Sequence, residues 1–169
     1  MGFLFYSISE TRVKQGKLLT TIPRLSTEWS WSFDYRTFGT IGYWGVILHC
    51  DSRNGVDGFG FRIPAIALVL GSGHELAIGS AVGSNSDYSI RMGHSSDFNK
   101  TNHLEIHQRY ISGGNYRYFV IHNGQEVHSK IHNNAIQFYN VKCWTYPPLH
   151  TSVIPSDVYI SNVIFTNFL

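Results

Sequence analysis

The stretch that decides the fold is Trp29–Tyr35, which reads Trp-Ser-Trp-Ser-Phe-Asp-Tyr. Large aromatic rings alternate with small or charged side chains along its whole length. Successive side chains of a β-strand point to opposite faces, so this alternation indicates a strand with one buried face. The same period of two recurs in short runs along most of the chain. The sequence therefore predicts a protein built from β-strands.

Turn signals separate these runs. Asn123-Gly124 lies between the strand-like runs 116–122 and 125–131, and both residues accept the positive φ angles of a type I′ hairpin turn. Pro64, inside the run 59–70, indicates an edge strand or a bulge. No segment has the pattern of an amphipathic helix. About eleven short strands predict an all-β fold, a two-sheet antiparallel β-sandwich or jelly roll, formed as one domain by residues 1–169. The remaining strands are expected at 46–49, 75–82, 88–92, 104–107, 138–144 and 158–168.

The composition excludes several classes of protein. Charged residues make up 14% of the chain, well below the roughly 25% of typical soluble proteins, which argues against disorder and coiled coils. The net charge is +2 and the basic residues are scattered, so nucleic-acid binding is not expected. No apolar run approaches the roughly 18–20 residues of a membrane-spanning helix, so membrane insertion is not expected either. The polar surface must consist largely of neutral side chains, which suit hydrogen bonding to sugars.

The two cysteines leave the compartment open. Cys50 and Cys143 have no zinc-ligand spacing around them, and they can be free, paired with each other or joined to another subunit. The N-terminus lacks the features of a signal peptide, so the chain is expected to be cytosolic or the mature form of a secreted protein. Asn99-Lys100-Thr101 is a glycosylation sequon and favours secretion weakly.

Two polar loops carry the strongest candidates for a binding site. The loops 51–58 and 83–87 are separated by two predicted strands, so an antiparallel sheet places them at the same end. Their carboxylate and amide oxygens are the hard donors that Ca²⁺ binds at roughly 2.3–2.6 Å. Such a site leaves coordination positions for sugar hydroxyls. The predicted calcium ligands are Asp51, Asn54, Asp57, Asn85 and Asp87.

Simpler interpretations remain beside this one. Asp, Asn, Ser and Gly are also the ordinary residues of tight turns, and the spacing does not match an EF-hand. A second polar group, at the opposite end of the predicted sheet, ranks below the first because it has fewer carboxylates. It consists of His94, Asp97 and Asn99, joined by Asp157.

A sugar site is also expected to contain a cation and an aromatic ring. Arg62 can donate to sugar oxygens in a fork geometry, although it can equally be a cation in solvent. Tyr88 adjoins the favoured loop and is the predicted stacking partner for a pyranose. Trp144 and Tyr146, in a later proline-rich segment, are further aromatic candidates.

An enzymatic site is not expected. Glycosidases of the glucanase type use a pair of carboxylates roughly 5–9.5 Å apart, and none of the five glutamates has an acid two residues away. Nucleophile-elbow and metalloprotease motifs are missing from the sequence. Glu105 and His107 can form an acid–base pair, but on an alternating strand they more simply belong to the solvent face.

Several segments resemble the concanavalin A-like, or laminin-G-like, jelly-roll domains that occur in cnidarian proteins. The resemblance covers roughly residues 17–166. It rests on Leu18–Pro23, Trp29–Tyr35, Arg62–Ile66, Ser80–Val82, Asn123-Gly124 with Val127–Ser129, Phe138–Lys142 and Val158–Ile164.

The chain is also similar in size and character to the galactose-specific lectins of sea anemones. That resemblance implies a secreted homodimer that binds terminal β-linked galactose on glycans with the help of Ca²⁺. One departure is Phe61, which stands where the family pattern leads us to expect an acidic residue before Arg-Ile-Pro. The alternatives are a laminin-G-like adhesion module that binds proteins and holds structural calcium, and a hydrolase of the glucanase type.

Overall fold

The fold consists of β-strands alone in the part of the chain that the structure describes. The structure is a computed structural model, and it describes residues 2–5, 9–38, 44–53, 58–69, 75–93, 99–148 and 157–168. None of these residues forms a helix long and apolar enough to cross a membrane. The strands are β1 (Gly2–Phe5), β2 (Thr11–Arg12), β3 (Leu18–Leu25), β4 (Trp29–Thr37), β5 (Trp44–Asp51), β6 (Ala65–Val69), β7 (Glu75–Val82), β8 (Asn85–Gly93), β9 (Asn102–Ser112), β10 (Asn115–His122), β11 (Gln125–His132), β12 (Phe138–Trp144) and β13 (Val158–Phe168).

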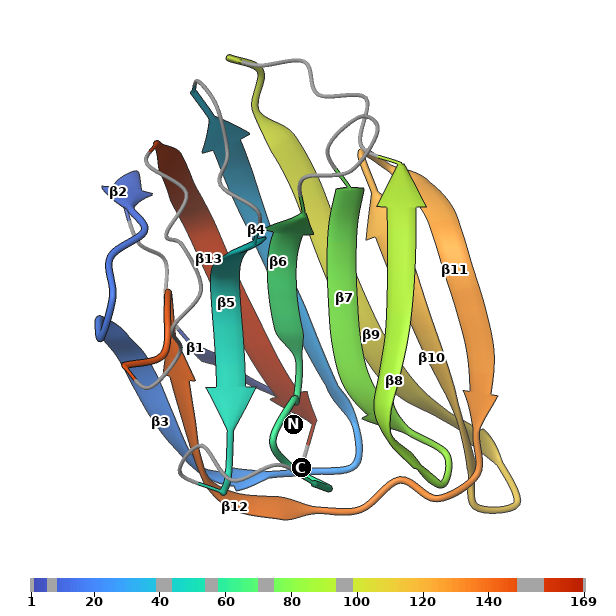
Figure 1. The fold of residues 1–169 in the computed structure, drawn as a ribbon. Helices are drawn as coiled ribbons and strands as arrows, with labels where there is room; N and C mark the ends of the chain where they lie inside the picture. The colour runs from blue at the N-terminus through green and yellow to red at the C-terminus, as the bar shows by residue number, and fades with distance from the viewer. Residues whose placement is uncertain are drawn as a thin grey trace.

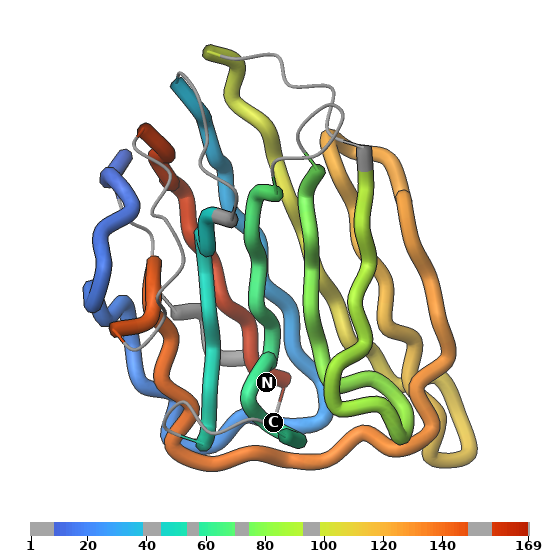
Figure 2. The backbone as a smooth tube through the Cα atoms, in the orientation of Figure 1, coloured from blue at the N-terminus to red at the C-terminus, as the bar shows by residue number. Residues whose placement is uncertain are grey.

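The strands form two antiparallel sheets that face each other (Figure 1). A seven-stranded sheet has the order β1-β13-β4-β9-β10-β11, with β2 also paired to β13. A six-stranded sheet has the order β3-β12-β5-β6-β7-β8. The backbone trace in Figure 2 shows the same two layers, with β8 and β11 at the same lateral edge of the sandwich. The predicted fold class, an all-β antiparallel sandwich, is therefore confirmed, whereas the single-domain boundary at residues 1–169 stays a prediction.

Alternation of side chains builds the core between the sheets. In β4 the aromatic residues Trp31, Phe33 and Tyr35 are each 1% exposed, while the intervening residues are half-buried. Trp31 packs against Phe165 of β13 with the ring centroids 4.8 Å apart. Burying such rings gives the largest favourable contribution to folding, because it removes the most apolar surface from water.

The hairpin turn follows the prediction, and one strand departs from it. Asn123 and Gly124 have φ angles of 50° and 79°, as the type I′ turn requires. The predicted strand 59–70 begins only at Ala65, after the cis Ile63–Pro64 peptide bond. Of the two expectations for this strand, the edge position is wrong, since β6 lies between β5 and β7, whereas its ladder with β5 does contain a register shift, between Val46 and Leu48. Pro64 is tolerated because it precedes the strand, and its carbonyl accepts a hydrogen bond from the Cys50 backbone at 2.8 Å.

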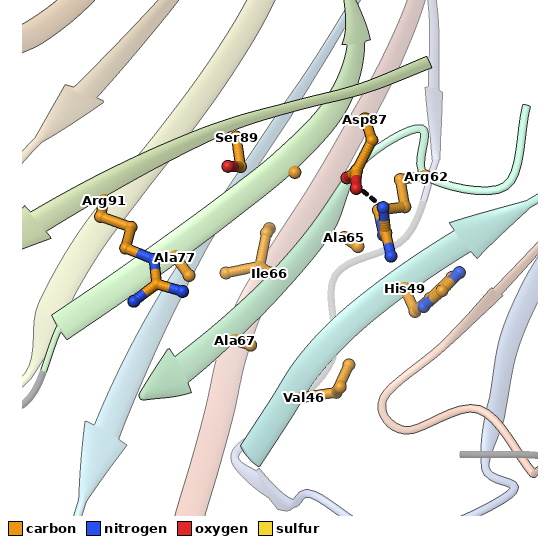
Figure 3. A pocket seen from close by; sticks show the side chains of 11 residues that line it. Val46, His49, Arg62, Ala65, Ile66, Ala67, Ala77, Asp87, Ser89 and Arg91 are labelled. Carbon is orange, nitrogen blue, oxygen red and sulfur yellow. Dashed lines mark hydrogen bonds and ion pairs between the residues drawn. The ribbon is translucent and has the colours of Figure 1, made fainter. Parts of the chain in front are cut away.

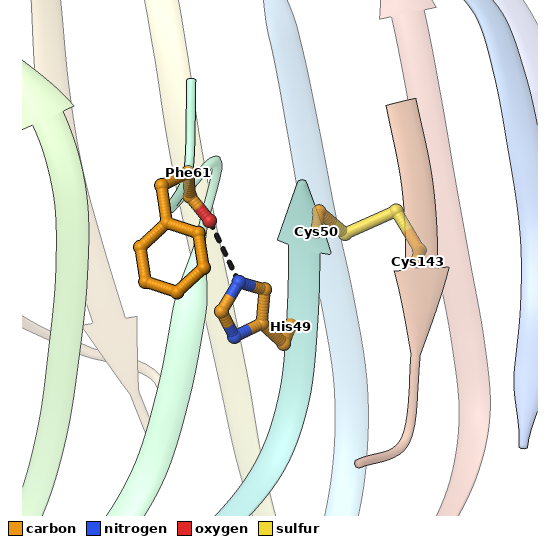
Figure 4. Close-up of a disulfide and its surroundings, with 4 residues drawn as sticks. All are labelled: His49, Cys50, Phe61 and Cys143. Carbon is orange, nitrogen blue, oxygen red and sulfur yellow. Dashed lines mark hydrogen bonds between the residues drawn. A yellow bond between two sulfur atoms is a disulfide. The ribbon is translucent and has the colours of Figure 1, made fainter. Parts of the chain in front are cut away.

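A disulfide joins Cys50 of β5 to Cys143 of β12 (Figure 4). The two residues are direct partners in the ladder between these strands, and both are 0% exposed on the core side of the sheet. The alternatives of free or intersubunit cysteines are thereby resolved in favour of an internal bridge. A structural disulfide is consistent with an extracellular protein, because such bonds persist in oxidising compartments.

Replacing both cysteines, in the variant Cys50→Ala/Cys143→Ala, is expected to destabilise the fold. The bridge spans 93 residues of sequence. Without the bridge, the unfolded chain gains the conformational freedom of a loop of that length. The free energy of unfolding then falls by about 3–5 kcal/mol. Denaturant unfolding of the variant and the wild type measures the difference. Unchanged stability would show that the bridge does not constrain the unfolded chain.

A buried histidine lies on the inner face of β11. His132 is 2% exposed, and its Nδ1 lies 2.7 Å from Oε1 of Gln108. The Gln108 amide in turn donates to the carbonyl of Thr27 at 2.8 Å. Burial lowers the pKa of His132 below its ordinary value of 6.5. The neutral imidazole is therefore the form that the fold accommodates.

This burial makes stability depend on pH. Below about pH 6.5 the unfolded chain binds a proton at His132 that the folded chain does not, so the unfolding free energy falls as the pH decreases from 7 towards the lowered pKa. The variant His132→Gln should lose part of this slope while keeping the contact with Gln108. Thermal unfolding between pH 5 and 7.5 measures both slopes. Equal slopes would exclude His132 as the source.

Candidate functional site

A groove runs over the outer face of the six-stranded sheet. Its volume is about 250 Å³, and side chains of β5 to β8 line it (Figure 3). Most side chains on its floor are small, and two of them, Ala67 and Ala77, are each 6% exposed. The floor consists of Ala65, Ala67, Ala77, Gly79 and Ser89.

The strand register explains why these small residues lie together. Ala65 pairs with Gly79, and Gly79 pairs with Ser89, so the three form one row across the sheet. Because side chains alternate, the neighbouring positions face the core and are large; Ile66 and Ile78, for example, are 0% exposed. The same alternation that fills the core therefore leaves a shallow floor on the opposite face.

An ion pair between Arg62 and Asp87 lies at one side of the groove (Figure 3). Arg62 precedes β6, and its carbonyl accepts a hydrogen bond from the Ala81 backbone of β7 at 3.2 Å. Its side chain then passes over Gly79 to reach Asp87 on β8. A Cβ atom at Gly79 would lie 3.0 Å from Cδ of Arg62, so the missing side chain leaves space for this path. The Arg62 side chain is 28% exposed and that of Asp87 is 63% exposed, so both remain accessible.

Two further polar residues line the groove. His49 is 1% exposed, and its Nε2 lies 2.6 Å from the carbonyl of Phe61 (Figure 4). A carbonyl only accepts hydrogen bonds, so this ring nitrogen carries the hydrogen. Arg91 is more exposed, and its guanidinium lies 3.5 Å from the carboxylate of Glu75. Each of the two guanidinium groups of the groove therefore has a carboxylate beside it.

The predicted calcium ligands are only partly described. Strands β5 and β7 run in the same direction, so Asp51 and the turn after β7 do lie at the same end of the sheet (Figure 1). Asp51 is 3% exposed, and its carboxylate accepts a hydrogen bond from the backbone of Arg53. Asn54 and Asp57 lie outside the described residues.

The second predicted loop is engaged in its own contacts. Oδ1 of Asn85 accepts a hydrogen bond from the Asp87 backbone at 2.9 Å, and the Asp87 carboxylate contacts Arg62. A guanidinium beside a would-be ligand disfavours a second cation there. Within the described ranges, no group of three or more His, Cys, Asp and Glu side chains is placed to hold a metal.

The predicted sugar-binding pair is not brought together. Arg62 lies in the groove, but Tyr88 points from β8 towards the other sheet. Its hydroxyl lies 3.1 Å from Nε2 of His128, and Nζ of Lys130 lies 4.0 Å from the centroid of its ring. Neighbouring residues on a strand face opposite ways, so Asp87 and Tyr88 cannot share one site.

The other aromatic candidates differ from each other. Tyr146 is 0% exposed and belongs to the core. Trp144 is half-buried and is the ladder partner of His49, so it lies on the outer face beside the groove. Sequence reasoning did not identify His49 or Gly79 as site residues. The pattern that could have indicated the groove is the series of small residues at every second position of two adjacent strands.

The lower-ranked polar groups lie elsewhere. His94 and Asp97 are outside the described residues, Asn99 is exposed, and Asp157 lies 3.4 Å from Arg12. Glu105 and His107 do form a contact, with Oε2 and Nε2 2.9 Å apart, on the outer face of the seven-stranded sheet.

Comparison with known proteins defines the fold. No family model matches the chain, and no curated protein matches it by sequence. Among solved structures, a heptameric SAP-like pentraxin from Limulus polyphemus matches with a TM-score of 0.58 and 14% identity, over 94% of this chain and 70% of the pentraxin. The alginate lyase Aly36B, as a variant in complex with an alginate tetrasaccharide, matches with a TM-score of 0.62 and 14% identity, over 94% of this chain and 80% of the lyase.

A third similar structure is that of domains LG4-5 of the mouse laminin alpha1 chain. It matches with a TM-score of 0.56 and 15% identity, over 95% of this chain and 42% of the laminin fragment. The chain therefore has the concanavalin A-like jelly-roll fold. Non-catalytic proteins and polysaccharide lyases share this fold, so the activity must be argued from the groove.

The Arg62–Asp87 pair is expected to contribute little to stability. Exposed ion pairs typically contribute about 0.2–1 kcal/mol, because water and salt screen them. A double-mutant cycle of Arg62→Ala and Asp87→Ala, measured by denaturant unfolding, should give a coupling energy within this range that disappears at about 1 M salt. A larger coupling energy that persists at high salt would show that the pair stabilises the fold and is not available to a ligand.

Proposed function

We propose that this protein is a non-catalytic carbohydrate-binding domain, and that the groove over β5 to β8 holds the sugar. One observation carries the proposal: an accessible guanidinium–carboxylate pair, Arg62 and Asp87, stands beside a floor of small side chains. Binding sites typically combine a shaped apolar surface with a few convergent polar groups.

The pair matches the chemistry of a sugar diol. Each hydroxyl group both donates and accepts hydrogen bonds. The Arg62 guanidinium can donate to one hydroxyl oxygen while the Asp87 carboxylate accepts the hydrogen of the neighbouring one. Hydrogen bonds to charged groups contribute more than neutral ones, about 1.5–3 kcal/mol each. The small side chain of Ala65 leaves room for the ring to approach the sheet beside Arg62, whose side chain passes over Gly79.

The lining of the groove does not favour catalysis. Polysaccharide cleavage needs a positioned acid and base within reach of the sugar. Among the described lining residues there is no Glu, Lys or Tyr, and the hydrogen of the His49 ring nitrogen is directed at a carbonyl. Asp87 is the single carboxylate among these described residues, and it contacts Arg62. A binding role therefore fits these residues better than a hydrolase or a lyase.

The finer parts of the proposal come from the sequence. Terminal β-linked galactose as the ligand, a secreted homodimer and a requirement for Ca²⁺ rest on the resemblance to sea-anemone lectins. Among the described donors, Asp87 is the least suited to a calcium ion, because the Arg62 guanidinium beside it disfavours a second cation. A calcium requirement would therefore depend on Asn54 and Asp57, which lie outside the described residues.

Calorimetric titration with lactose, in Ca²⁺ and again after chelation, tests the proposal. We expect saturable binding that Arg62→Ala and Asp87→Asn each weaken by about tenfold or more, through lost hydrogen bonds to charged groups. Gly79→Ala should weaken binding as well, because the added methyl group displaces Arg62. Arg117→Ala is the matched control, since Arg117 is also paired with a carboxylate, that of Glu126, but on the outer face of the other sheet.

The titration separates the remaining possibilities. Binding that survives chelation supports a lectin that does not require calcium. Binding that disappears with chelator and returns with Ca²⁺ supports the calcium site predicted from the sequence. Equal affinities of the wild type and the Arg62 and Asp87 variants would exclude the groove. The proposal is rejected if none of the sugars releases or absorbs heat: lactose, glucose- and mannose-type sugars, and β-1,4-linked oligosaccharides. A protein-binding adhesion module is then favoured.

A further inference from the structure

We infer that the sugar site extends across the sheet to Trp144, and that its ligand is an internal stretch of a neutral, extended β-1,4-linked glycan. This inference rests on the proposed function and specifies its ligand class. It departs from the expectation of a single terminal galactose, because the row of outward side chains is longer than one sugar.

The row follows directly from the ladder register. Trp144 of β12 pairs with His49 of β5, and His49 pairs with Ala65 of β6. Ala65 then pairs with Gly79, which pairs with Ser89 of β8. Directly opposed residues in an antiparallel ladder share one face of the sheet. The groove therefore ends at His49, and the next outward side chain in the same row is Trp144.

The spacing of this row suits a glycan chain. Neighbouring strands lie about 4.8 Å apart, so the four steps from Trp144 to Ser89 span roughly 19 Å. A pyranose ring with equatorial 1,4 linkages advances by nearly one strand spacing for each residue. A chain lying across the strands thus meets a new strand with each ring. A row of this length equals about four rings. Within it His49 is 1% exposed and the Arg62 side chain passes over Gly79, so the contacts of the glycan fall on Trp144, Arg62, Ala65 and Ser89.

Trp144 provides an aromatic surface at the end of this row. Trp29 and Trp31 are 2% and 1% exposed and belong to the core, whereas Trp144 is half-buried. An indole ring packs well against an apolar surface while its N–H remains available for a hydrogen bond. The C–H face of a pyranose is such an apolar surface. Leu18, the ladder partner of Trp144 on β3, is 48% exposed and continues the apolar surface outwards.

The charges of the groove favour a neutral chain over a polyanion. Arg62 has Asp87 beside it, and Arg91 has Glu75 at 3.5 Å. Binding a uronate at either arginine would bring its carboxylate close to an existing one, and like charges at such distances repel. Neutral hydroxyls can instead use the donor and the acceptor of each pair.

Titration with cello-, manno- and chito-oligosaccharides of two to five residues tests the inference. In at least one series the affinity should rise by about tenfold or more from the dimer to the tetramer and then level off. Trp144→Ala should remove most of this gain and Trp144→Phe should retain much of it, while the affinity for the dimer changes little. Tyr139→Ala is the matched control, because Tyr139 is an exposed aromatic residue of the same strand, 59% exposed.

Tryptophan fluorescence gives an independent readout. A tetramer that contacts Trp144 should change its emission, and the change should be absent in Trp144→Phe. Lactose binding without any gain from chain length, or equal gains in the wild type and Trp144→Ala, would overturn the extended site and leave the lectin proposal intact. Tighter binding of an oligouronate than of every neutral series would overturn the ligand class. Failure of all sugars to bind would reject the proposed function together with this inference.

Discussion

The structure depends on one constraint: alternate side chains of every central strand must fill the space between two sheets. In β4 this constraint selects Trp31, Phe33 and Tyr35, and in β6 and β7 it selects residues such as Ile66 and Ile78. The opposite positions of the same strands are then free of the packing requirement. On β6 and β7 most of those positions carry a small residue, namely Ala65, Ala67, Ala77 and Gly79, so the alternation that fills the core also forms the floor of the groove.

The polar part of the groove comes from segments at its border. Arg62 belongs to the irregular segment before β6, and its side chain reaches Asp87 over Gly79, where a Cβ atom would lie 3.0 Å from Cδ of Arg62. His49 is fixed by the carbonyl of the neighbouring Phe61. On the core side of the same strand, the disulfide at Cys50 ties β5 to β12. The contact of His49 with a backbone carbonyl and the disulfide thus fix the strand at one side of the groove. The charged pair of the groove remains accessible, as a preformed ligand site requires.

The sequence predicts the fold more fully than the site, for physical reasons. Local alternation and the Asn123-Gly124 turn specify strands and a hairpin without knowledge of the rest of the chain. Pro64 wrongly indicated an edge strand, because a proline directly before a strand does not interrupt its ladder. Tyr88 adjoins Asp87 in sequence but faces the other sheet, which a loop-based argument overlooks. The contact of Arg62 with Asp87 depends on a path over β7, and no local pattern encodes that path.

The central claim is that a glycan binds to the outer face of the six-stranded sheet, and NMR titration of the isotope-labelled protein with lactose and with a β-1,4-linked tetramer tests it most directly. We predict shifts of backbone amides at Ala65, Ala77, Gly79 and Ser89, with the Trp144 indole signal joining them for the tetramer. Shifts that cluster instead around Glu105 and Phe119, on the outer face of the seven-stranded sheet, would contradict the account, and so would the absence of any shift.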